Sequence, residues 1–166
     1  MPASLDAIFL RPAARTPVRA VPGALAVAGV GLEGDHTNGG RRQVTILARE
    51  AWDRACREFG GSVDPSVRRA NLLVRGVDLT ACIGGRLHIG EVVIDVLGET
   101  RPCELLDDGG RVGLCAALRP ERRGGVYGSI RVGGTLRAGD ACTAFPAGGH
   151  GRCATSSRAG WTTRET

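Results

Sequence analysis

Lysine is missing from this chain, since all 22 residues counted as Lys or Arg are arginines. Without a lysine amine no Schiff base can form, so the chain itself cannot hold pyridoxal phosphate covalently. The richness in arginine, alanine and glycine is typical of a GC-rich coding bias. A second interpretation is that the guanidinium groups recognise an anionic ligand, because arginine binds phosphate and carboxylate groups in bidentate fashion.

Long hydrophobic runs and export signals are also lacking. The longest uncharged stretch, residues 20–32, is too short to span a bilayer and contains three glycines and a proline. The first residues carry no basic segment, and Ile8-Phe9-Leu10 is too brief for the apolar part of a signal peptide. We therefore expect a soluble cytoplasmic protein that does not act at a membrane.

Aromatic residues and paired cysteines are scarce. The aromatics make up 4% of the chain and are spread through it, so they offer no platform for stacking bases. Nucleic-acid binding is therefore not expected, despite a formal net charge of +5. None of the 6 cysteines belongs to a C-x-x-C pair, which argues against a zinc site and against a disulfide framework. We expect free thiols.

The patterns that are present predict one mainly β domain. One helix is expected, because the apolar residues Trp52, Ala55, Cys56 and Phe59 share a helical face, and it should stop at Gly60-Gly61. Short helical turns are expected at residues 103–107 and 112–118, and residues 11–21 are expected to be a loop. Apolar, β-branched runs predict strands at residues 5–10, 25–30, 43–47, 71–74, 87–97, 126–132 and 141–145.

An internal repeat refines this prediction. Residues 83–91 and 132–140 both read apolar-Gly-Gly-x-Leu-x-x-Gly-acidic, and each copy is expected to lead into a strand. Tight glycine corners around short strands are typical of a small curved sheet or barrel. We therefore predict a small β-barrel with a few short helices over residues 1–146. Residues 147–166, mostly Gly, Ser, Thr and Arg, are expected to be a disordered tail.

Two segments could supply contacts to an anion. Asp35 and His36 lie in a glycine-rich loop that lets the backbone approach a ligand closely, and Arg41 and Arg42 follow the loop, so donors for an anion could converge there. The alternative is a turn in which the aspartate bonds its own backbone. Farther on, Arg68 and Arg69 come shortly before Asn71 at the start of a strand, which suits phosphate or carboxylate recognition. A solvated pair of arginines is the alternative there.

Cys103 is the candidate functional thiol. A cysteine works as nucleophile or metal ligand only as a thiolate, and a neighbouring cation such as Arg101 favours that form. Pro102 fixes the backbone ahead of the thiol, and the strand before it would place it at a strand end. The cysteines at positions 82, 115 and 142 lie among apolar or small residues and are interpreted as packing residues.

The order of these motifs resembles the MOSC domain, the C-terminal domain of molybdenum cofactor sulfurases, here as a small stand-alone bacterial-type protein. The resemblance runs from about Gly31 to Thr143. It rests on Gly34-Asp35-His36 with Gly39-Gly40, Asn71-Leu72 with Gly76-Val77-Asp78-Leu79, Ile89-Gly90-Glu91, Arg101-Pro102-Cys103, Gly124-Gly125-Val126-Tyr127-Gly128, and Gly133-Gly134 with Gly139-Asp140.

The resemblance implies a β-rich, barrel-like fold that binds the molybdenum cofactor (molybdopterin) or carries sulfur. Relatives use a cysteine after a proline as the reactive or metal-ligating residue, and that role maps onto Cys103. Many relatives have arginine or glutamate before the asparagine, where this chain has Ala70. The cofactor contacts expected from the motifs and the resemblance together are Asp35, His36, Arg41, Arg68, Arg69, Asn71 and Arg101.

Three classes of function stay open at this stage. The first is a molybdenum-cofactor-binding or sulfur-carrier protein, in which Cys103 carries a persulfide or ligates molybdenum. The second is a molybdenum-dependent reductase of N-hydroxylated compounds that works with electron-donor partners. The third is a non-catalytic module that binds polyanions. Since the pyridoxal-phosphate desulfurase domain of the large sulfurases is absent from this chain, a separate desulfurase-type protein would donate sulfur.

Overall fold

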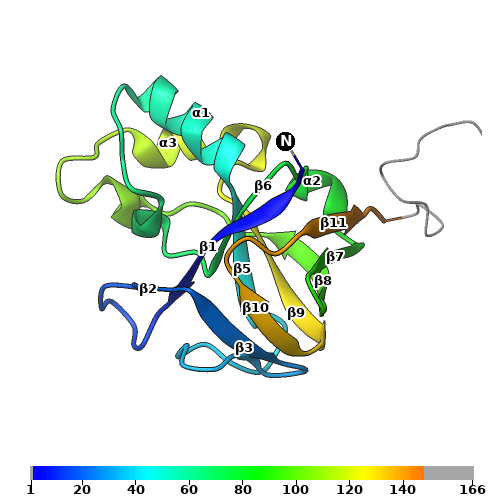
Figure 1. Ribbon diagram of the computed structural model, residues 1–166. Helices are drawn as coiled ribbons and strands as arrows, with labels where there is room; N and C mark the ends of the chain where they lie inside the picture. The colour runs from blue at the N-terminus through cyan, green and yellow to red at the C-terminus, as the bar shows by residue number, and fades with distance from the viewer. Residues whose placement is uncertain (1, 148–166) are drawn as a thin grey trace, which may run out of the picture.

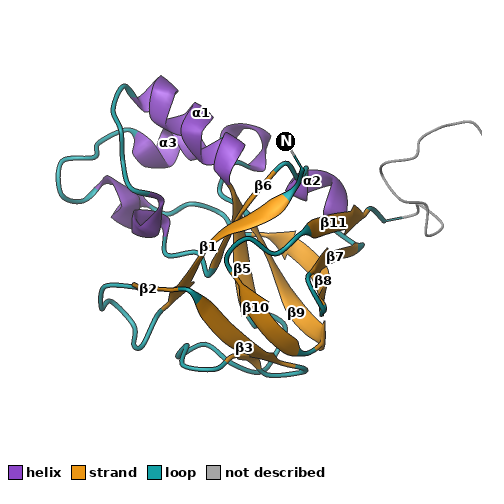
Figure 2. Ribbon diagram, viewed as in Figure 1, coloured by secondary structure: helices purple, strands orange, loops and turns teal. Residues whose placement is uncertain are grey.

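Strands dominate the computed structural model, which describes residues 2–147 (Figures 1 and 2). The larger sheet has eight strands in the order β11 (Cys142–Phe145), β7 (Arg86–Ile89), β8 (Val92–Glu99), β9 (Val126–Val132), β5 (Val44–Ala48), β6 (Leu72–Arg75), β1 (Ser4–Leu10) and β2 (Arg19–Val21). The smaller sheet has the order β10 (Gly134–Arg137), β3 (Gly23–Val27) and β4 (Gly31–Leu32).

The mainly β prediction is confirmed, but the barrel is not. The larger sheet runs from β11 to β2 without closing on itself. The start of β1 nevertheless lies against the start of β11, because the Leu5 amide donates to the Asp140 carbonyl at 2.8 Å and the Cys142 amide donates to the Ala3 carbonyl at 3.0 Å. β5 and β6 are the one parallel pair among the described strands, which requires a crossover between them.

Helices cover one side of the larger sheet. The crossover between β5 and β6 contains α1 (Arg49–Phe59), which lies beside α3 (Leu114–Leu118) in Figure 2. α1 ends at Gly60, whose φ of +96° is a left-handed conformation that glycine adopts without strain. The other helical segments are α2 (Leu79–Cys82) and the 3₁₀ helices η1 (Pro65–Arg68), η2 (Glu104–Asp107) and η3 (Pro120–Arg122).

Two hydrophobic cores lie on opposite faces of the central strands. On β6, Leu72 and Val74 belong to the core enclosed by the two sheets, whereas Leu73 belongs to the core beneath α1 and α3. The same alternation holds on β5, where Ile46 belongs to the core between the sheets and Leu47 to the core beneath α1 and α3. Successive side chains of a strand point to opposite faces, so apolar runs with no polar alternation are what a strand between two cores requires.

Several boundaries differ from the sequence-based prediction. The strand expected over residues 87–97 is wrong as a single element: β7 and β8 form a hairpin that turns at Gly90 and Glu91. The strand expected over residues 25–30 ends at Val27, where a turn begins. The loop expected over residues 11–21 contains β2, which pairs with the end of β1.

The internal repeat has a structural counterpart. Its two copies lead into β7 and β10, as expected. The copies also contact each other, because the Glu91 carboxylate accepts a hydrogen bond from the Thr135 amide at 2.8 Å. The acidic residue that closes the first copy therefore holds the strand of the second.

Three other predictions concern the thiols, membrane-spanning helices and the C-terminal tail. The cysteines within residues 2–147 are all unpaired, and Cys103 is the exposed one. In that same part of the chain, no helix is long and apolar enough to cross a membrane. The expected tail, residues 147–166, lies outside the described residues apart from Ala147.

Candidate functional site

A cavity of about 470 Å³ opens beside Cys103. It lies between the segment that follows β1, the end of η1 and the segment that contains η2. Segments far apart in the sequence therefore share one site. Its lining residues are Arg11, Arg42, Thr45, Val67, Arg68, Arg69, Ala70, Thr100, Cys103, Leu105, Leu106, Asp108 and Arg111.

Guanidinium groups dominate the charge of this cavity. Five of the lining residues are arginines and one, Asp108, is acidic. Arg11 forms an ion pair with Asp35, with 3.0 Å between Nη2 and Oδ2. Within residues 2–147, none of the other four lining arginines lies within ion-pair distance of a carboxylate. The cavity is therefore positively charged and suits an anionic ligand.

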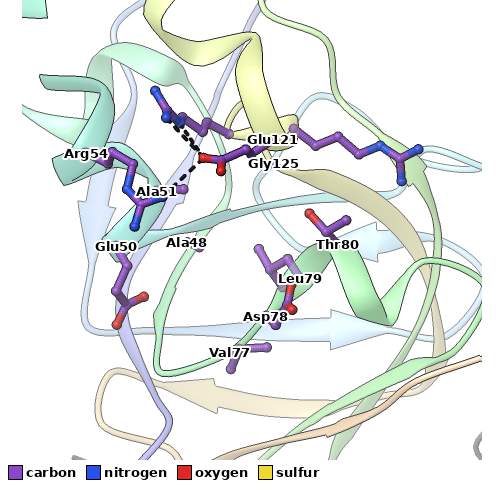
Figure 3. Close-up of a pocket in the computed structure, with 12 residues that line it drawn as sticks. Ala48, Glu50, Ala51, Arg54, Val77, Asp78, Leu79, Thr80, Glu121 and Gly125 are labelled. Atoms are coloured by element: carbon purple, nitrogen blue, oxygen red, sulfur yellow. Dashed lines mark hydrogen bonds and ion pairs between the residues drawn. The ribbon is translucent and has the colours of Figure 1, made fainter. Parts of the chain in front are cut away.

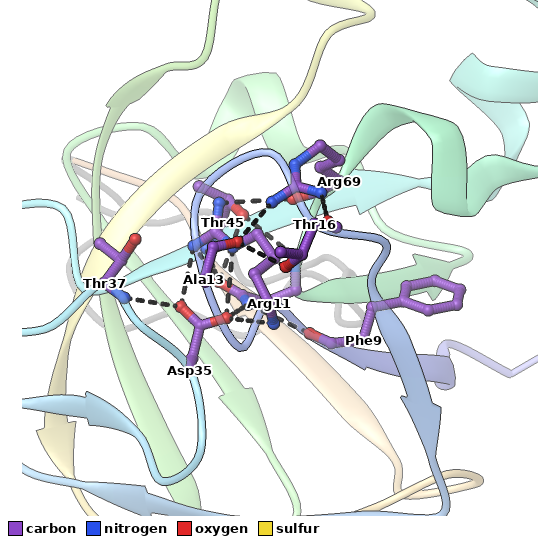
Figure 4. Close-up of polar contacts among 9 residues, drawn as sticks. Phe9, Arg11, Ala13, Thr16, Asp35, Thr37, Thr45 and Arg69 are labelled. Atoms are coloured by element: carbon purple, nitrogen blue, oxygen red, sulfur yellow. Dashed lines mark hydrogen bonds and ion pairs between the residues drawn. The ribbon is translucent and has the colours of Figure 1, made fainter.

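Asp35 fixes the position of Arg11 (Figure 4). The Arg11 backbone amide donates to Asp35 Oδ1 at 2.7 Å, and its Nε donates to the same oxygen at 3.2 Å. The expected turn is present too, because the Thr37 amide donates to Asp35 Oδ2 at 3.2 Å. Burial opposes ionisation of Asp35, but the hydrogen bonds and charge of Arg11 outweigh it and lower the pKa of this carboxyl.

Asn71 is fully buried behind the cavity. Its Nδ2 donates to the Phe9 carbonyl at 3.1 Å and to Asp35 Oδ1 at 3.0 Å. Its Oδ1 accepts hydrogen bonds from the Thr45 amide at 3.1 Å and from Arg11 Nη2 at 3.2 Å. With both ends of the amide engaged, Asn71 supports Arg11 and ties β6 to β5 and β1.

Arg69 holds the loop that follows β1. Its guanidinium donates to the carbonyls of Thr16 and Ala13, as Figure 4 shows. The backbone of Arg69 has a φ of +64°, which is uncommon for a residue other than glycine and turns the chain out of η1. This conformation places Arg69 in the cavity wall, directly after Arg68.

Arg68 is the cation that binds the segment leading to Cys103. Its Nε donates to the Gly124 carbonyl and its Nη2 to the Thr100 carbonyl, both at 3.0 Å. Burial, with a smaller contribution from Arg42, lowers the pKa of Arg68 to about 10. Cys103 lies at the N-terminal end of η2 and lines the same cavity.

The residues predicted from the sequence fall into three groups. Arg42, Arg68, Arg69 and Cys103 line the cavity. Asp35 and Asn71 lie behind it and contact each other, so the glycine-rich loop and the Asn71 strand do meet. The remaining predicted residues, His36, Arg41 and Arg101, are exposed and do not line the cavity.

Two arginines of the cavity, Arg11 and Arg111, were not expected from the sequence, whereas Arg42 was expected beside Arg41 as an anion-binding donor. Arg11 directly follows β1, and the pairing of β1 with β6 brings it to Arg69 and Asn71. Arg42 and Arg111 come from a loop and from the segment after η2. Neither Arg11 nor Arg111 belongs to a local motif, and only the topology of the sheet could have indicated Arg11.

A second cavity, of about 500 Å³, lies near the start of α1 (Figure 3). Its lining contains acidic and basic side chains together, and Glu121 is bound by Arg54 at 3.1 Å and by Arg123 at 3.0 Å. No cysteine lines it among the residues described. Its charges are largely paired within the protein, so the cavity at Cys103 is the stronger candidate site.

Comparisons with known proteins agree with this fold. The chain resembles the YuaD protein from Bacillus subtilis with a TM-score of 0.68 and 19% identity, over 86% of this chain and 94% of that one. It resembles YiiM from Escherichia coli with a TM-score of 0.63 and 21% identity, over 83% and 67%. For YiiM from Geobacillus stearothermophilus the TM-score is 0.67 and the identity 14%, over 89% and 78%. No curated protein matches the sequence.

The family follows from the sequence itself. Residues 33–143, about two thirds of the chain, match the family described as MOSC domain. The matched range includes Asp35, Asn71 and Cys103, and it contains most of the cavity lining. MOSC domains are associated in general with binding of the molybdenum cofactor. The chain belongs to the MOSC domain family.

Proposed function

We propose that this protein binds the molybdenum cofactor in the cavity beside Cys103, with the Cys103 thiolate as molybdenum ligand or as the carrier of a persulfide. The observation that supports this proposal most is the combination of an exposed thiol with four arginines that lack a carboxylate partner within residues 2–147. A cofactor that has an anionic phosphate at one end and a thiolate-binding metal at the other needs both kinds of group.

The donors of the cavity fit such a group. Burying part of an arginine without a counter-ion costs free energy, and a bound phosphate would supply the counter-ion. The candidates to hold it are Arg69 and Arg111, which are partly buried, and Arg42, which is exposed. All three line the cavity and have no ion pair within residues 2–147, and unlike Arg68 they do not bridge the Gly124 and Thr100 carbonyls. When bound, the molybdenum centre would supply redox chemistry that protein side chains lack.

A carrier role would use the same thiol. Cys103 is exposed, so a separate protein could deliver sulfur to it or take sulfur from it. A persulfide on Cys103 would be an anion at neutral pH, and the neighbouring guanidinium groups would stabilise it. The partner proposed for this role is a desulfurase-type donor, or a redox partner if the molybdenum remains in place.

The test is the content of the purified protein. The chain is purified from a host that makes molybdenum cofactor, and molybdenum and pterin are measured per chain. We expect both in the wild type and a strong loss of molybdenum in Cys103→Ser, whereas Arg122→Gln in the second cavity serves as the matched control. If neither molybdenum nor pterin is retained, loading with polysulfide distinguishes a carrier: Cys103 then gains one sulfur atom by peptide mass spectrometry. Failure of both measurements would overturn the proposal.

A further inference from the structure

Arg68 differs from the other arginines of the cavity because it binds two backbone segments at once. The Gly124 and Thr100 carbonyls that accept its hydrogen bonds belong to the turn before β9 and to the segment after β8. These carbonyls each lie 3.0 Å from a guanidinium nitrogen. A planar guanidinium presents donors at fixed angles, so it can bridge two acceptors that the point charge of a lysine could not hold in the same way.

The two bridged segments are also in close contact with each other. Thr100 Oγ1 donates to the Gly124 carbonyl at 2.9 Å, and the Thr100 amide donates to the Gly125 carbonyl at 2.9 Å. A Cβ placed on Gly124 would lie 2.6 Å from the Thr100 carbonyl oxygen and 3.3 Å from Arg68 Nη2. No side chain fits there, so the glycine is what lets the guanidinium reach both carbonyls.

This bridge lies three residues before the thiol. Thr100 is buried and Pro102 is buried, so the path from the bridge to Cys103 is short and restricted. Arg68 and Cys103 line the same cavity, whereas Arg101 is exposed and lies outside the cavity lining. In the described part of the chain, Arg68 Nη1 has no hydrogen-bond partner and Arg68 has no carboxylate partner.

We propose that Arg68 is the positioning residue for Cys103, rather than Arg101, which lies two residues from Cys103 in the sequence. Two nitrogens of Arg68 hold the segment that carries the thiol, and the positive charge of Arg68 selects an anionic group at that thiol. The inference rests on the proposed function only in that Cys103 is the working group. Arg68 thereby has a role of its own, whereas the charge of the cavity alone would not distinguish it from the other arginines that line the cavity.

Two alkylating reagents test this proposal without any cofactor. Rates of Cys103 modification by anionic iodoacetate and by neutral iodoacetamide are measured by peptide mass spectrometry at the same pH. The ratio of the iodoacetate rate to the iodoacetamide rate does not depend on the accessibility of the thiol or on its ionised fraction, because a merely structural change alters both rates by the same factor. We expect Arg68→Met to lower the ratio about threefold or more, and Arg101→Gln to change it little because exposed charges are screened.

A third variant separates the clamp from the charge. Arg68→Lys keeps the charge, so it should restore most of the ratio, but it cannot bridge both carbonyls. Hydrogen exchange of residues 99–108 should therefore be faster in Arg68→Lys than in the wild type. If Arg68→Met does not fold, Arg68→Gln takes its place in the rate comparison.

The outcomes that overturn the inference are distinct. An unchanged ratio in Arg68→Met, or in Arg68→Gln where that variant takes its place, would remove the role of Arg68 in selecting anions, as would an equal fall in Arg101→Gln. Unchanged hydrogen exchange in Arg68→Lys would remove the clamp. Because alkylation needs neither molybdenum nor pterin, these results can fail while cofactor binding succeeds, and the reverse.

Discussion

Asp35 and Asn71 are 36 residues apart in the chain, yet Asn71 Nδ2 donates to Asp35 Oδ1 at 3.0 Å, and both side chains bind Arg11. The side chain of Asp35 is fully buried and that of Arg11 is 13% exposed. This buried polar group joins the glycine-rich loop, β1 and β6 behind the cavity. Its members are satisfied by one another, so the loss of one leaves the others without partners.

The first prediction concerns the pH dependence of stability. Folding lowers the pKa of Asp35 below its ordinary value of 3.8, so its ionised form stabilises the fold at neutral pH, and this contribution is lost as the pH falls toward the folded-state pKa. Asp35→Asn should lower the free energy of unfolding by about 1–3 kcal/mol at neutral pH, measured by urea denaturation. The gap to the wild type should narrow below about pH 4.

Asp95→Asn is the matched control for this prediction. Asp95 pairs with Arg86 and Arg131, but all three side chains are 27% exposed or more. Surface ion pairs contribute about 0–1 kcal/mol, so this variant should differ little from the wild type. A gap for Asp35→Asn that stays the same from neutral pH to about pH 3 would contradict the assignment of its effect to the carboxylate charge.

The second prediction concerns the reactivity of the thiols. Burial raises the pKa of Cys82 to about 11 and that of Cys142 to about 12, so neither supplies appreciable thiolate at neutral pH. Cys103 is exposed and should be alkylated first by iodoacetamide, as peptide mass spectrometry will show. Modification of Cys82 or Cys142 at a rate similar to that of Cys103 would contradict this order.

The third prediction separates two residues that the sequence groups together as cofactor contacts. Arg69 lines the cavity, whereas His36 is exposed and outside its lining. Arg69→Ala should therefore weaken cofactor retention clearly, about tenfold if one charge-assisted contact of about 1.4 kcal/mol is lost. His36→Ala should weaken it much less. Equal losses in washed, purified samples would place the glycine-rich loop in contact with the cofactor.

The fourth prediction tests the core between the sheets. Leu72 is fully buried on β6, and Leu72→Ala should lower the free energy of unfolding by about 2–5 kcal/mol. Leu25 is 41% exposed on β3, so Leu25→Ala should cost less than about 1 kcal/mol. Thermal denaturation followed by circular dichroism measures both. A larger effect at Leu25 than at Leu72 would mean that the two residues are wrongly placed.

The parts of the site that the sequence could predict are those that local motifs carry. Cys103 after Pro102, and Arg68 with Arg69 before a strand, are short patterns with direct chemical meaning. Arg11 could not be found in this way, because the pairing of β1 with β6 is what brings it to the site. Local reasoning also favoured Arg101 as the cation for the thiol because it lies two residues away. The structure brings Arg68, 35 positions distant, to that segment instead.

The strand pattern was predictable where one run of residues forms one strand. β1, β5 and β9 match their expected ranges within about one residue, because their apolar runs are bounded by polar or glycine residues. The β7–β8 hairpin was predicted as one strand because apolar residues continue on both sides of Gly90-Glu91, although the internal repeat marks Gly90 as a glycine corner. A two-residue turn interrupts such a pattern too briefly to be recognised from periodicity alone.

The most direct test of cofactor binding at Cys103 is the number of sulfur ligands on molybdenum. X-ray absorption spectroscopy at the molybdenum edge counts them in protein purified from a cofactor-competent host. In samples adjusted to the same molybdenum concentration, binding through the Cys103 thiolate predicts one sulfur ligand fewer on the molybdenum that Cys103→Ser retains than in the wild type and in Cys56→Ser. An identical sulfur count in the three proteins would show that Cys103 does not ligate molybdenum.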